Sequence, residues 1–513
     1  MGPGGPLPAG SGGRGPGARV SGPLLLGIDE GTTAVKAGLF ELDLSPVALA
    51  RRAVPVSHPR AGWVEQDPEL ILEAVIETVA EILPAATGRG VLAAGLDHQG
   101  ESVLAWEAGS GRALSPVIVW QDKRHESSLA SRAPLVEELT GLPRDPYFSA
   151  GKLAWLLAEE APVRAARSAG TLRLGTVDAF LLERLGGGFT TDLSTASRTQ
   201  LLALGGRDWD PRLLAEFGIE RSWLPRLGPS FGELGRLSHE RWPVSLPLRA
   251  QLVDQQAALA GSGAVAPGQV KATYGTGVFV LGRTPGPEPC PGLLPTVAWA
   301  GPGEGGAPGE PSYALDGGVF AAGALLEWLA GELGLAQDPA SLARLAGEVP
   351  DSDGVRILPA LAGLGSPWWR AGARGVIAGL HGGVGPAQIA RAALEAIAQR
   401  VADVVEAMAP AIEIRSLRVD GGLTADPTLL QIQADLLGVP LIRSRPDATV
   451  LGAAMLAGVG AGVFAGVEQA AELLGEGRTV TGRLDSAARL GLRREWREFV
   501  AAAASLQPAR AAS

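Results

Sequence analysis

The stretch LLLGIDEGTTAVKAGLFELD, residues 24–43, decides the fold class of this chain. Its two short apolar runs, separated by Gly-Thr-Thr, predict two strands joined by a tight turn. Asp29 lies at the end of the first run, where the strand is expected to be buried. Because a buried carboxylate is costly unless something holds it, a metal, a hydrogen-bond network or a substrate is expected beside Asp29.

The second half of the chain repeats this pattern. VKATYGTGVFVLGRT, residues 270–284, predicts another strand, a Gly-Thr-Gly turn and a strand. Amphipathic helices are predicted over 62–83, with Asp67 as the N-cap, and over 385–408, with Pro386 near the start. The repetition predicts two similar α/β domains that face one another, with a boundary near 255–265.

Length and composition limit the class of protein. The 513 residues suggest two or three domains at about 150 residues each. The net charge of −10 gives no basic surface for nucleic acid or an anionic membrane, so neither is an expected partner. Cys290 is the one cysteine, which excludes an intramolecular disulfide, and no apolar run reaches the length of about 18 residues that a membrane span needs.

The N-terminal residues 1–22 are rich in glycine and proline and are predicted to be a disordered tail. They lack the apolar core of a signal peptide, so we expect a cytoplasmic protein. The tail contains a GxGxxG match at 10–15, but no strand precedes it and no helix follows, so it does not indicate a dinucleotide site.

The glycine-rich turns indicate how this chain could bind phosphate. It has no GxxxxGK[ST] motif, so it is not a P-loop protein. A tight turn can direct backbone N–H groups and threonine hydroxyls at phosphate oxygens. The turns at 31–33 and 275–277 could therefore hold the phosphates of a nucleotide from two sides, and Gly421-Gly422 could approach its nucleoside.

A series of collinear blocks over about residues 24–465 resembles the FGGY carbohydrate kinases, and within that family the glycerol kinases. The blocks are GIDEGTTAVKAGLF, GWVEQDP, VIVWQDKR, YFSAGKLAWLL, TDLSTASRTQLL, DQQAALAG, KATYGTGVFVL, ALDGGVFAAGALLEWL, ARGVIAGL and RVDGG. The resemblance implies two actin-like (ribonuclease-H-like) domains with a cleft between them, at 23–257 and 258–505. It also implies that ATP and Mg²⁺ are used to phosphorylate a hydroxyl of a small polyol or sugar.

The resemblance also implies roles for individual residues. Asp29 would lie beside the magnesium ion, and Asp254 of the DQQ block would be the catalytic base, a role compatible with an N-cap for the helix that follows. Asp192, Ser197 and Arg198 are expected to be caps and structural pairs. The implied nucleotide-binding residues are Thr32, Thr33, Lys36, Thr276, Gly323, Glu327, Gly422 and Asp426. The implied substrate-binding residues are Glu101, Trp120, Tyr147, Asp254, Gln255 and Phe279.

One departure from the family concerns the substrate. Glycerol kinases carry Asn-Gln-Arg-Glu where this chain has His98-Gln99-Gly100-Glu101. Gly100 cannot donate to a polyol hydroxyl as the arginine does, so we expect an enlarged pocket with His98 as a possible new donor. A smaller departure is Asp426, where family members often have asparagine near the adenine.

Three functions are compatible with these residues. The first is phosphorylation of glycerol to glycerol 3-phosphate. The second, motivated by Gly100, is phosphorylation of a tetritol, a pentulose or a related sugar. The third is a non-catalytic actin-like ATP-binding protein, which would have no use for a base at Asp254. Assembly into a homo-oligomer is left open.

Overall fold

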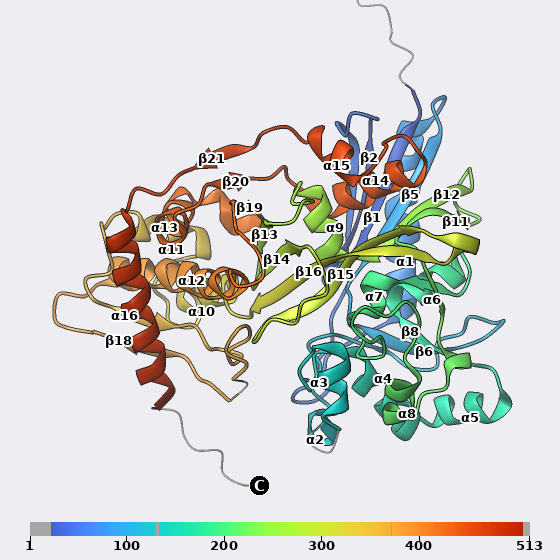
Figure 1. Cartoon of the computed structure of the whole chain (residues 1–513), viewed down its shortest axis with the longest axis horizontal. Coiled ribbons are helices and arrows are strands. Elements are labelled where there is room, and N and C mark those ends of the chain that lie inside the picture. The colour runs from blue at the N-terminus through green and yellow to red at the C-terminus, as the bar shows by residue number, and fades with distance from the viewer. Residues whose placement is uncertain (1–21, 130–132, 371, 506–513) are drawn as a thin grey trace, which may run out of the picture.

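The computed structural model describes residues 22–129, 133–370 and 372–505 (Figure 1). The predicted disordered tail, apart from Gly22, lies outside the described residues. Two large mixed β-sheets form the centres of the two halves of the molecule, with helices packed on their faces (Figure 1). No helix in the described ranges is long and apolar enough to cross a membrane.

The six-stranded sheet contains the hairpin that opens the chain. Its strands are β1 (Leu24–Glu30), β2 (Ala34–Phe40), β3 (Pro46–Ala53), β5 (Val91–His98), β11 (Phe231–Leu237) and β12 (Leu246–Val253), in the order β11-β12-β5-β1-β2-β3. The three strands β1–β3 pair antiparallel, whereas β1, β5 and β12 run parallel. The carboxyl ends of β1, β5 and β12 therefore meet at one edge of the sheet.

The seven-stranded sheet repeats this topology. Its strands are β13 (Gln269–Tyr274), β14 (Val278–Thr284), β15 (Leu294–Pro302), β16 (Pro308–Val319), β19 (Ser416–Asp420), β20 (Leu441–Arg443) and β21 (Arg478–Val480), in the order β15-β16-β14-β13-β19-β20-β21. Here β13, β14 and β16 pair antiparallel, and β13, β19 and β20 run parallel. The repeated α/β unit that the two hairpins predicted is confirmed. The sequence YALDGGVFAAGALLEWLA, residues 313–330, predicts a turn that leads into a helix. The turn is wrong at its start, because β16 extends to Val319, whereas the helix is confirmed and begins at Gly323.

The helix starts agree with their predicted caps. Helix α1 (Pro68–Ile82) begins after Asp67, whose Oδ1 accepts a hydrogen bond of 2.9 Å from the N–H of Glu69. Helical spacing predicts an apolar face formed by Leu70, Val75, Val79 and Leu83, but Leu70 is 47% exposed. The buried face of α1 carries Ile71, Leu72, Val75, Ile76 and Val79. The predicted helix over 385–408 is α12 (Pro386–Met408).

A third region, at the lower right of Figure 1, carries a four-stranded sheet in the order β4-β7-β6-β8. The sequence did not reveal this sheet. Residues 91–106 predict two strands joined by a polar loop, and the second of these strands, β6 (Val103–Glu107), lies in this sheet. The apolar run in SPVIVWQDKR, residues 115–124, predicts another strand, and the strand that forms is only Val117–Ile118. The strands of this sheet are β4 (Glu65–Gln66), β6 (Val103–Glu107), β7 (Val117–Ile118) and β8 (Leu172–Thr176). A separate pair is formed by β9 (Thr190–Asp192) and β10 (Arg226–Gly228). The helices between Glu126 and Phe217 are α2 (Glu126–Leu129), α3 (Leu135–Thr140), α4 (Ser149–Glu159), α5 (Ala161–Ala169), α6 (Val177–Arg184), α7 (Leu193–Ala196) and α8 (Pro211–Phe217).

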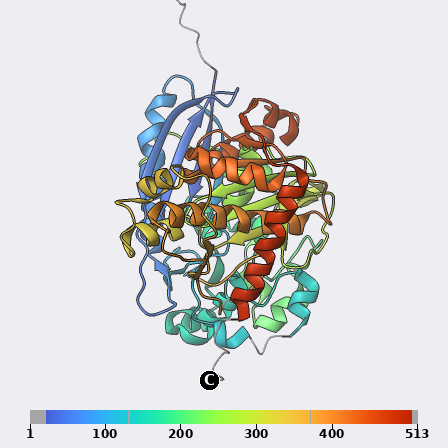
Figure 2. The same ribbon diagram turned by 90° about the vertical axis from the view of Figure 1, so that its left-hand side faces the viewer.

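The second half of the chain supplies most of the remaining helices. Helix α16 crosses the face of the molecule that Figure 2 turns toward the viewer. The remaining elements are α9 (Asp254–Gly261), α10 (Gly323–Gly331), α11 (Pro339–Ala346), β17 (Arg356–Leu358), β18 (Val376–Ala378), α13 (Pro427–Leu437), α14 (Ala448–Gly460), α15 (Val467–Glu472) and α16 (Ser486–Ser505).

Helix α14 joins the two halves. It follows β20 of the second sheet in the chain but packs on β1, β5 and β12 of the first sheet and on α9. Glycines allow this close approach: a Cβ at Gly27 would lie 2.0 Å from the carbonyl oxygen of Val450, and one at Gly452 would lie 1.9 Å from that of Ala257. The backbones of α9 and α14 therefore touch, and they connect the two sheets.

Replacing Gly452 with alanine is expected to lower the free energy of unfolding by about 1–3 kcal/mol or more, because the added methyl group overlaps the backbone of α9. Thermal or urea denaturation measures the loss. Gly491→Ala in α16 is the matched control, since no atom lies within 4 Å of the added Cβ and alanine favours a helix. Equal stability of the two variants would contradict the close packing of α9 and α14.

Candidate active site

Three aspartates lie together where the parallel strands of the first sheet end. Asp29 is the penultimate residue of β1 and is the register partner of Asp97 in β5, and Asp254 directly follows β12. Burial raises the pKa of all three carboxyls, and the charge of Asp29 raises the pKa of both Asp97 and Asp254 further. This edge therefore concentrates negative charge that a bound cation would neutralise.

A cavity of about 140 Å³ opens beside Asp254. All six predicted substrate-binding residues line it, although they come from five separate segments of the chain. The lining residues are Thr32, Gln99, Gly100, Glu101, Trp120, Tyr147, Arg198, Val253, Asp254, Gln255, Gln256, Phe279 and Asp316.

Aromatic rings from both halves of the molecule form one wall of this cavity. The ring of Trp120 packs edge-on against Tyr147 at 5.6 Å between centroids and against Phe279 of β14 at 6.0 Å. Trp120 Nε1 also donates a hydrogen bond of 3.0 Å to Thr32 Oγ1. The apolar wall is thereby attached to the first Gly-Thr-Thr turn.

Asp254 has the properties of a proton acceptor. Burial, and then the charges of Asp29 and Glu101, raise the pKa of Asp254 to about 7, while Lys271 opposes the shift. The Lys271 ammonium donates a hydrogen bond of 2.6 Å to Gln255 Oε1. Because this bond fixes the orientation of the Gln255 amide, its NH₂ group remains available as a donor. A carboxyl with a pKa near neutrality suits general-base chemistry.

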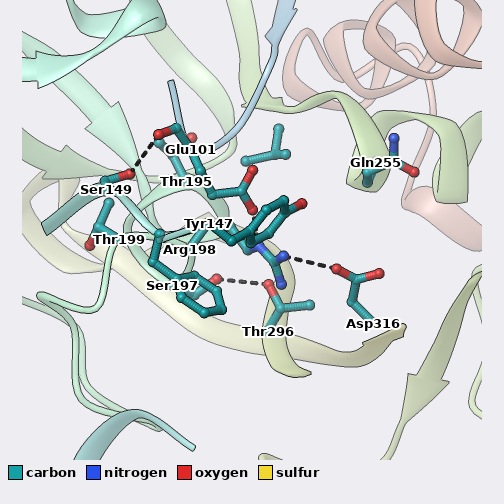
Figure 3. A network of polar contacts seen from close by, with 12 residues as sticks. Glu101, Tyr147, Ser149, Thr195, Ser197, Arg198, Thr199, Gln255, Thr296 and Asp316 are labelled. Carbon is teal, nitrogen blue, oxygen red and sulfur yellow. Dashed lines mark hydrogen bonds and ion pairs between the residues drawn. The ribbon is translucent and has the colours of Figure 1, made fainter. Parts of the chain in front are cut away.

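Arg198 lies between two carboxylates at the cavity (Figure 3). Its Nε donates to Glu101 Oε1 at 2.7 Å, and its Nη2 lies 2.9 Å from Asp316 Oδ2. The expectation of a structural pair for Arg198 is confirmed, but the residue also lines the cavity. The cap predicted at Asp192 is confirmed too, since its carboxylate accepts from the N–H of Thr195 at 2.9 Å.

The structure corrects two expectations drawn from the Gly100 departure. A Cβ at Gly100 would lie 2.8 Å from Val253 Cγ1, so Val253 fills the space that an enlarged pocket would need. His98 is fully buried, bonds through Nε2 to Thr195 Oγ1 at 2.9 Å, and is absent from the lining of the cavity. His98 is therefore not a donor to a ligand in this cavity.

The second Gly-Thr turn lies against the start of α10. The N–H of Gly323 donates to the carbonyl of Gly275 at 3.1 Å, and a Cβ at Gly323 would lie 2.7 Å from that oxygen. Gly421, with φ of 92°, crosses the end of β13 so closely that a Cβ would lie 2.2 Å from the carbonyl oxygen of Tyr274. The turn, the start of α10 and the loop after β19 therefore meet at one edge of the second sheet.

The other predicted nucleotide-binding residues lie in the two turns or in elements that adjoin them. Thr33 and Thr276 are exposed in the two turns, and Glu327 is exposed one helical turn after Gly323. Gly422 follows Gly421, and Asp426 caps α13 by accepting from the N–H of Leu429 at 2.8 Å. Lys36 Nζ lies 3.0 Å from Asp447 Oδ1 and 4.0 Å from Asp29 Oδ2.

The carboxylates of Asp29 and Asp97 are the candidates to hold a cation. Asp97 is fully buried, and within the described residues neither of its oxygens has a hydrogen-bond partner. The part of the chain that the structure describes contains no group of three or more His, Cys, Asp or Glu residues placed to hold a metal by themselves. The pair suits Mg²⁺, which binds proteins through one or two carboxylates and completes its shell with water and phosphate.

Sequence reasoning missed five residues of this site: Asp97, Arg198, Gln256, Lys271 and Asp316. Asp97 and Lys271 lie within apolar strands, where an isolated charge was a usable signal. Asp316 lies in ALDGG, which was interpreted as a turn. Arg198 and Gln256 carried no signal of their own, because only folding brings them to the cavity.

Comparison with known proteins agrees with this architecture. The model of the FGGY family of carbohydrate kinases, N-terminal domain, matches residues 24–261, and that of its C-terminal domain matches residues 270–461. A protein named glycerol kinase from Citrifermentans bemidjiense is 44% identical over 455 residues, which cover 86% of this chain and 90% of the relative. Another from Thermus brockianus is 43% identical and covers 93% and 97% of the two chains.

Solved structures give the same result. The Plasmodium falciparum glycerol kinase with ADP superposes with a TM-score of 0.86 at 28% identity, covering 94% of this chain and 98% of that one. The xylulose kinase from Rhodospirillum rubrum superposes with a TM-score of 0.81 at 25% identity, with coverage of 94% and 99%. The predicted two-domain fold and family resemblance are confirmed, and the chain belongs to the FGGY family of carbohydrate kinases.

Proposed function

We propose that this protein transfers the γ-phosphoryl group of ATP to a hydroxyl of a small polyol, with glycerol forming glycerol 3-phosphate. The observation that carries the proposal is Asp254, a half-buried carboxyl with a raised pKa that lines a small cavity. Relatives at 43–44% identity are named glycerol kinase, which supports glycerol as the acceptor.

Asp254 acts as the base in this proposal. It accepts the proton of the attacking hydroxyl while the Gln255 amide, held by Lys271, orients the substrate. Glu101 accepts from a further hydroxyl, and Trp120, Tyr147 and Phe279 cover the carbon chain. The aromatic wall also excludes water that would compete for the phosphoryl group.

ATP would lie between the two glycine-threonine turns. Thr32, Thr33 and Lys36 would contact its phosphates from the first sheet, and Thr276 from the second. The contacts of Gly323 with Gly275, and of Gly421 with Tyr274, support a shared nucleotide site at that edge. The base-binding part of this site comprises Gly323, Glu327, Gly422 and Asp426.

Asp29 would hold the Mg²⁺ that accompanies ATP, with Asp97 beside it. The buried, unpartnered oxygens of Asp97 and the negative charge of its neighbours fit a cation at this edge. When bound, the ion would neutralise negative charge on the phosphates of ATP during phosphoryl transfer. The role of these two residues is to position it next to the first turn.

The cavity beside Asp254 suits a small acceptor, since its volume of about 140 Å³ is below the range of about 300–1,000 Å³ of pockets for drug-sized ligands. Val253 also closes the side that Gly100 leaves open. This closed side favours a three-carbon polyol over a tetritol or a pentulose. We also propose that the protein is cytoplasmic, which fits ATP as the phosphoryl donor. A further proposal is the division of the chain into two domains, 23–257 and 258–505, which are connected through α9.

An acceptor panel tests this function. Coupled ADP-release assays over glycerol, tetritols, pentitols and ketoses are expected to give the highest kcat/KM with glycerol, since it fits the small cavity. A reaction without acceptor is the control for ATP hydrolysis. A tetritol or pentulose with the higher kcat/KM would replace glycerol as the substrate. Nucleotide binding without ADP release for any acceptor would favour the non-catalytic alternative.

A further inference from the structure

Three residues that line the cavity, among them Arg198, each have a polar side-chain atom for which the described residues offer no partner. The Arg198 side chain is 3% exposed, and its Nε and Nη2 are paired with Glu101 and Asp316. Among the described residues, no hydrogen-bond partner is found for Arg198 Nη1, Asp316 Oδ1 or Gln256 Oε1. All three residues line the cavity.

These atoms match the hydrogen-bonding capacity of an alcohol. Arg198 Nη1 can only donate, whereas Asp316 Oδ1 and Gln256 Oε1 accept. A hydroxyl group accepts through its oxygen and donates through its hydrogen, so one hydroxyl can pair with both kinds of atom. Buried polar groups are rarely left without a partner, which indicates that a ligand completes this end of the cavity.

We propose that Arg198 binds a substrate hydroxyl that is not phosphorylated, and that it thereby determines substrate specificity. Its Nη1 donates to the oxygen of that hydroxyl, whose hydrogen is accepted by Asp316 or Gln256. This inference rests on the proposed polyol kinase activity and identifies the donor that Gly100 cannot provide. Glu101, Asp254 and Asp316 only accept when they are ionised, so Arg198 is the cationic donor among the lining residues.

The geometry requires a guanidinium at this position. Nε and Nη2 hold two carboxylates at 2.7 and 2.9 Å, and the planar group leaves Nη1 directed away from both. The Tyr147 ring lies over the guanidinium, with 5.6 Å from its centroid to Cζ, and helps to fix that plane. A lysine could retain the charge but could not bridge both carboxylates and present a third donor in the same plane.

Diols that lack one hydroxyl of glycerol test the proposal. We compare kcat/KM for glycerol with that for 1,2-propanediol and for 1,3-propanediol, in the wild type, Arg198→Lys and Arg198→Met. The wild type is expected to favour glycerol by at least about 100-fold over the diol that lacks the contacted hydroxyl. In both variants that ratio is expected to fall at least tenfold, because the contact no longer exists. A general loss of packing would lower all three rates together and leave the ratio unchanged.

Arg400→Met is the matched control. Arg400 is buried and bonds Asp403 at 2.6 Å, but it does not line the cavity, so its loss is expected to leave both ratios unchanged. Thermal melting reports whether each variant folds. Asp316→Asn, which retains Arg198, is a further variant if the Arg198 variants do not fold, and it is expected to lower the same ratio.

Two results overturn the inference without overturning the proposed function. One is a wild type that phosphorylates glycerol and both diols with equal kcat/KM, which needs no variant to observe. The other is an unchanged ratio in folded Arg198 variants. A wild type that releases no ADP with glycerol or any other acceptor would overturn the proposed function itself.

Discussion

Asp254→Asn lowers kcat for phosphoryl transfer by about 10²–10⁴-fold, which is the usual contribution of a general base. The asparagine amide has nearly the same shape but cannot accept the proton of the attacking hydroxyl. The polyol cavity and the nucleotide-binding turns are otherwise retained, so ATP and glycerol still bind. Steady-state kinetics give the loss in kcat, and calorimetry gives the two dissociation constants.

The pH profile provides a second measurement of the same role. Burial and the charge of Asp29 raise the pKa of Asp254 to about 7, and only the ionised carboxylate accepts a proton. The kcat/KM of the wild type should therefore rise with pH and level off above about 7, and this rise should be absent in the Asp254→Asn variant.

Asp338→Asn is the control for the Asp254 substitution. Asp338 caps α11 by accepting from the N–H of Ser341 at 2.6 Å, and asparagine is an equally good cap. Wild-type kcat is expected for this variant. Wild-type turnover in Asp254→Asn would exclude Asp254 as the base.

Asp29→Asn weakens Mg²⁺ binding by the ADP-bound protein at least about tenfold, because the change removes one of the two adjacent carboxylates that would hold the ion. Asp97→Asn should weaken it as well, since both Asp97 oxygens lie buried and unpartnered beside Asp29. Titration with Mn²⁺, followed by electron paramagnetic resonance, measures the affinity independently of turnover.

Asp43→Asn serves as the control for metal binding. Asp43 accepts from the N–H of Ser45 at 2.9 Å in an exposed turn, and asparagine can make the same hydrogen bond. Its affinity for Mn²⁺ should equal that of the wild type. Equal affinity in Asp29→Asn and Asp43→Asn would place the ion elsewhere.

The local signals in the sequence were sufficient for the strands and turns around the site. Short apolar runs on either side of Gly-Thr turns predicted both hairpins, and Asp67 predicted the start of α1. These signals succeed because turn chemistry and helix capping depend on neighbouring residues. The same reasoning failed for β16, where the glycines of YALDGG were interpreted as a turn. It predicted β6 as a strand but not its sheet, since an apolar run does not indicate which sheet will contain it.

The candidate site was predictable in part. The family blocks identified all six residues expected to contact the substrate, and the structure places them around one cavity. The expected enlargement at Gly100 was wrong, because Val253, distant in the sequence, fills the space. Arg198 was interpreted only as a structural pair, since its partners Glu101 and Asp316 lie 97 and 118 residues away along the chain.

The sequence by itself determined the repeated hairpin unit, the acidic strand ends and the family. Tertiary structure alone decided that α14 packs on the first sheet through Gly27 and Gly452, and that Arg198 completes the polar end of the cavity. The physical reason is the distance along the chain over which each kind of interaction acts. Capping, turn geometry and periodicity act over a few residues, whereas close backbone contact and buried ion pairs exist only after distant segments have been brought together.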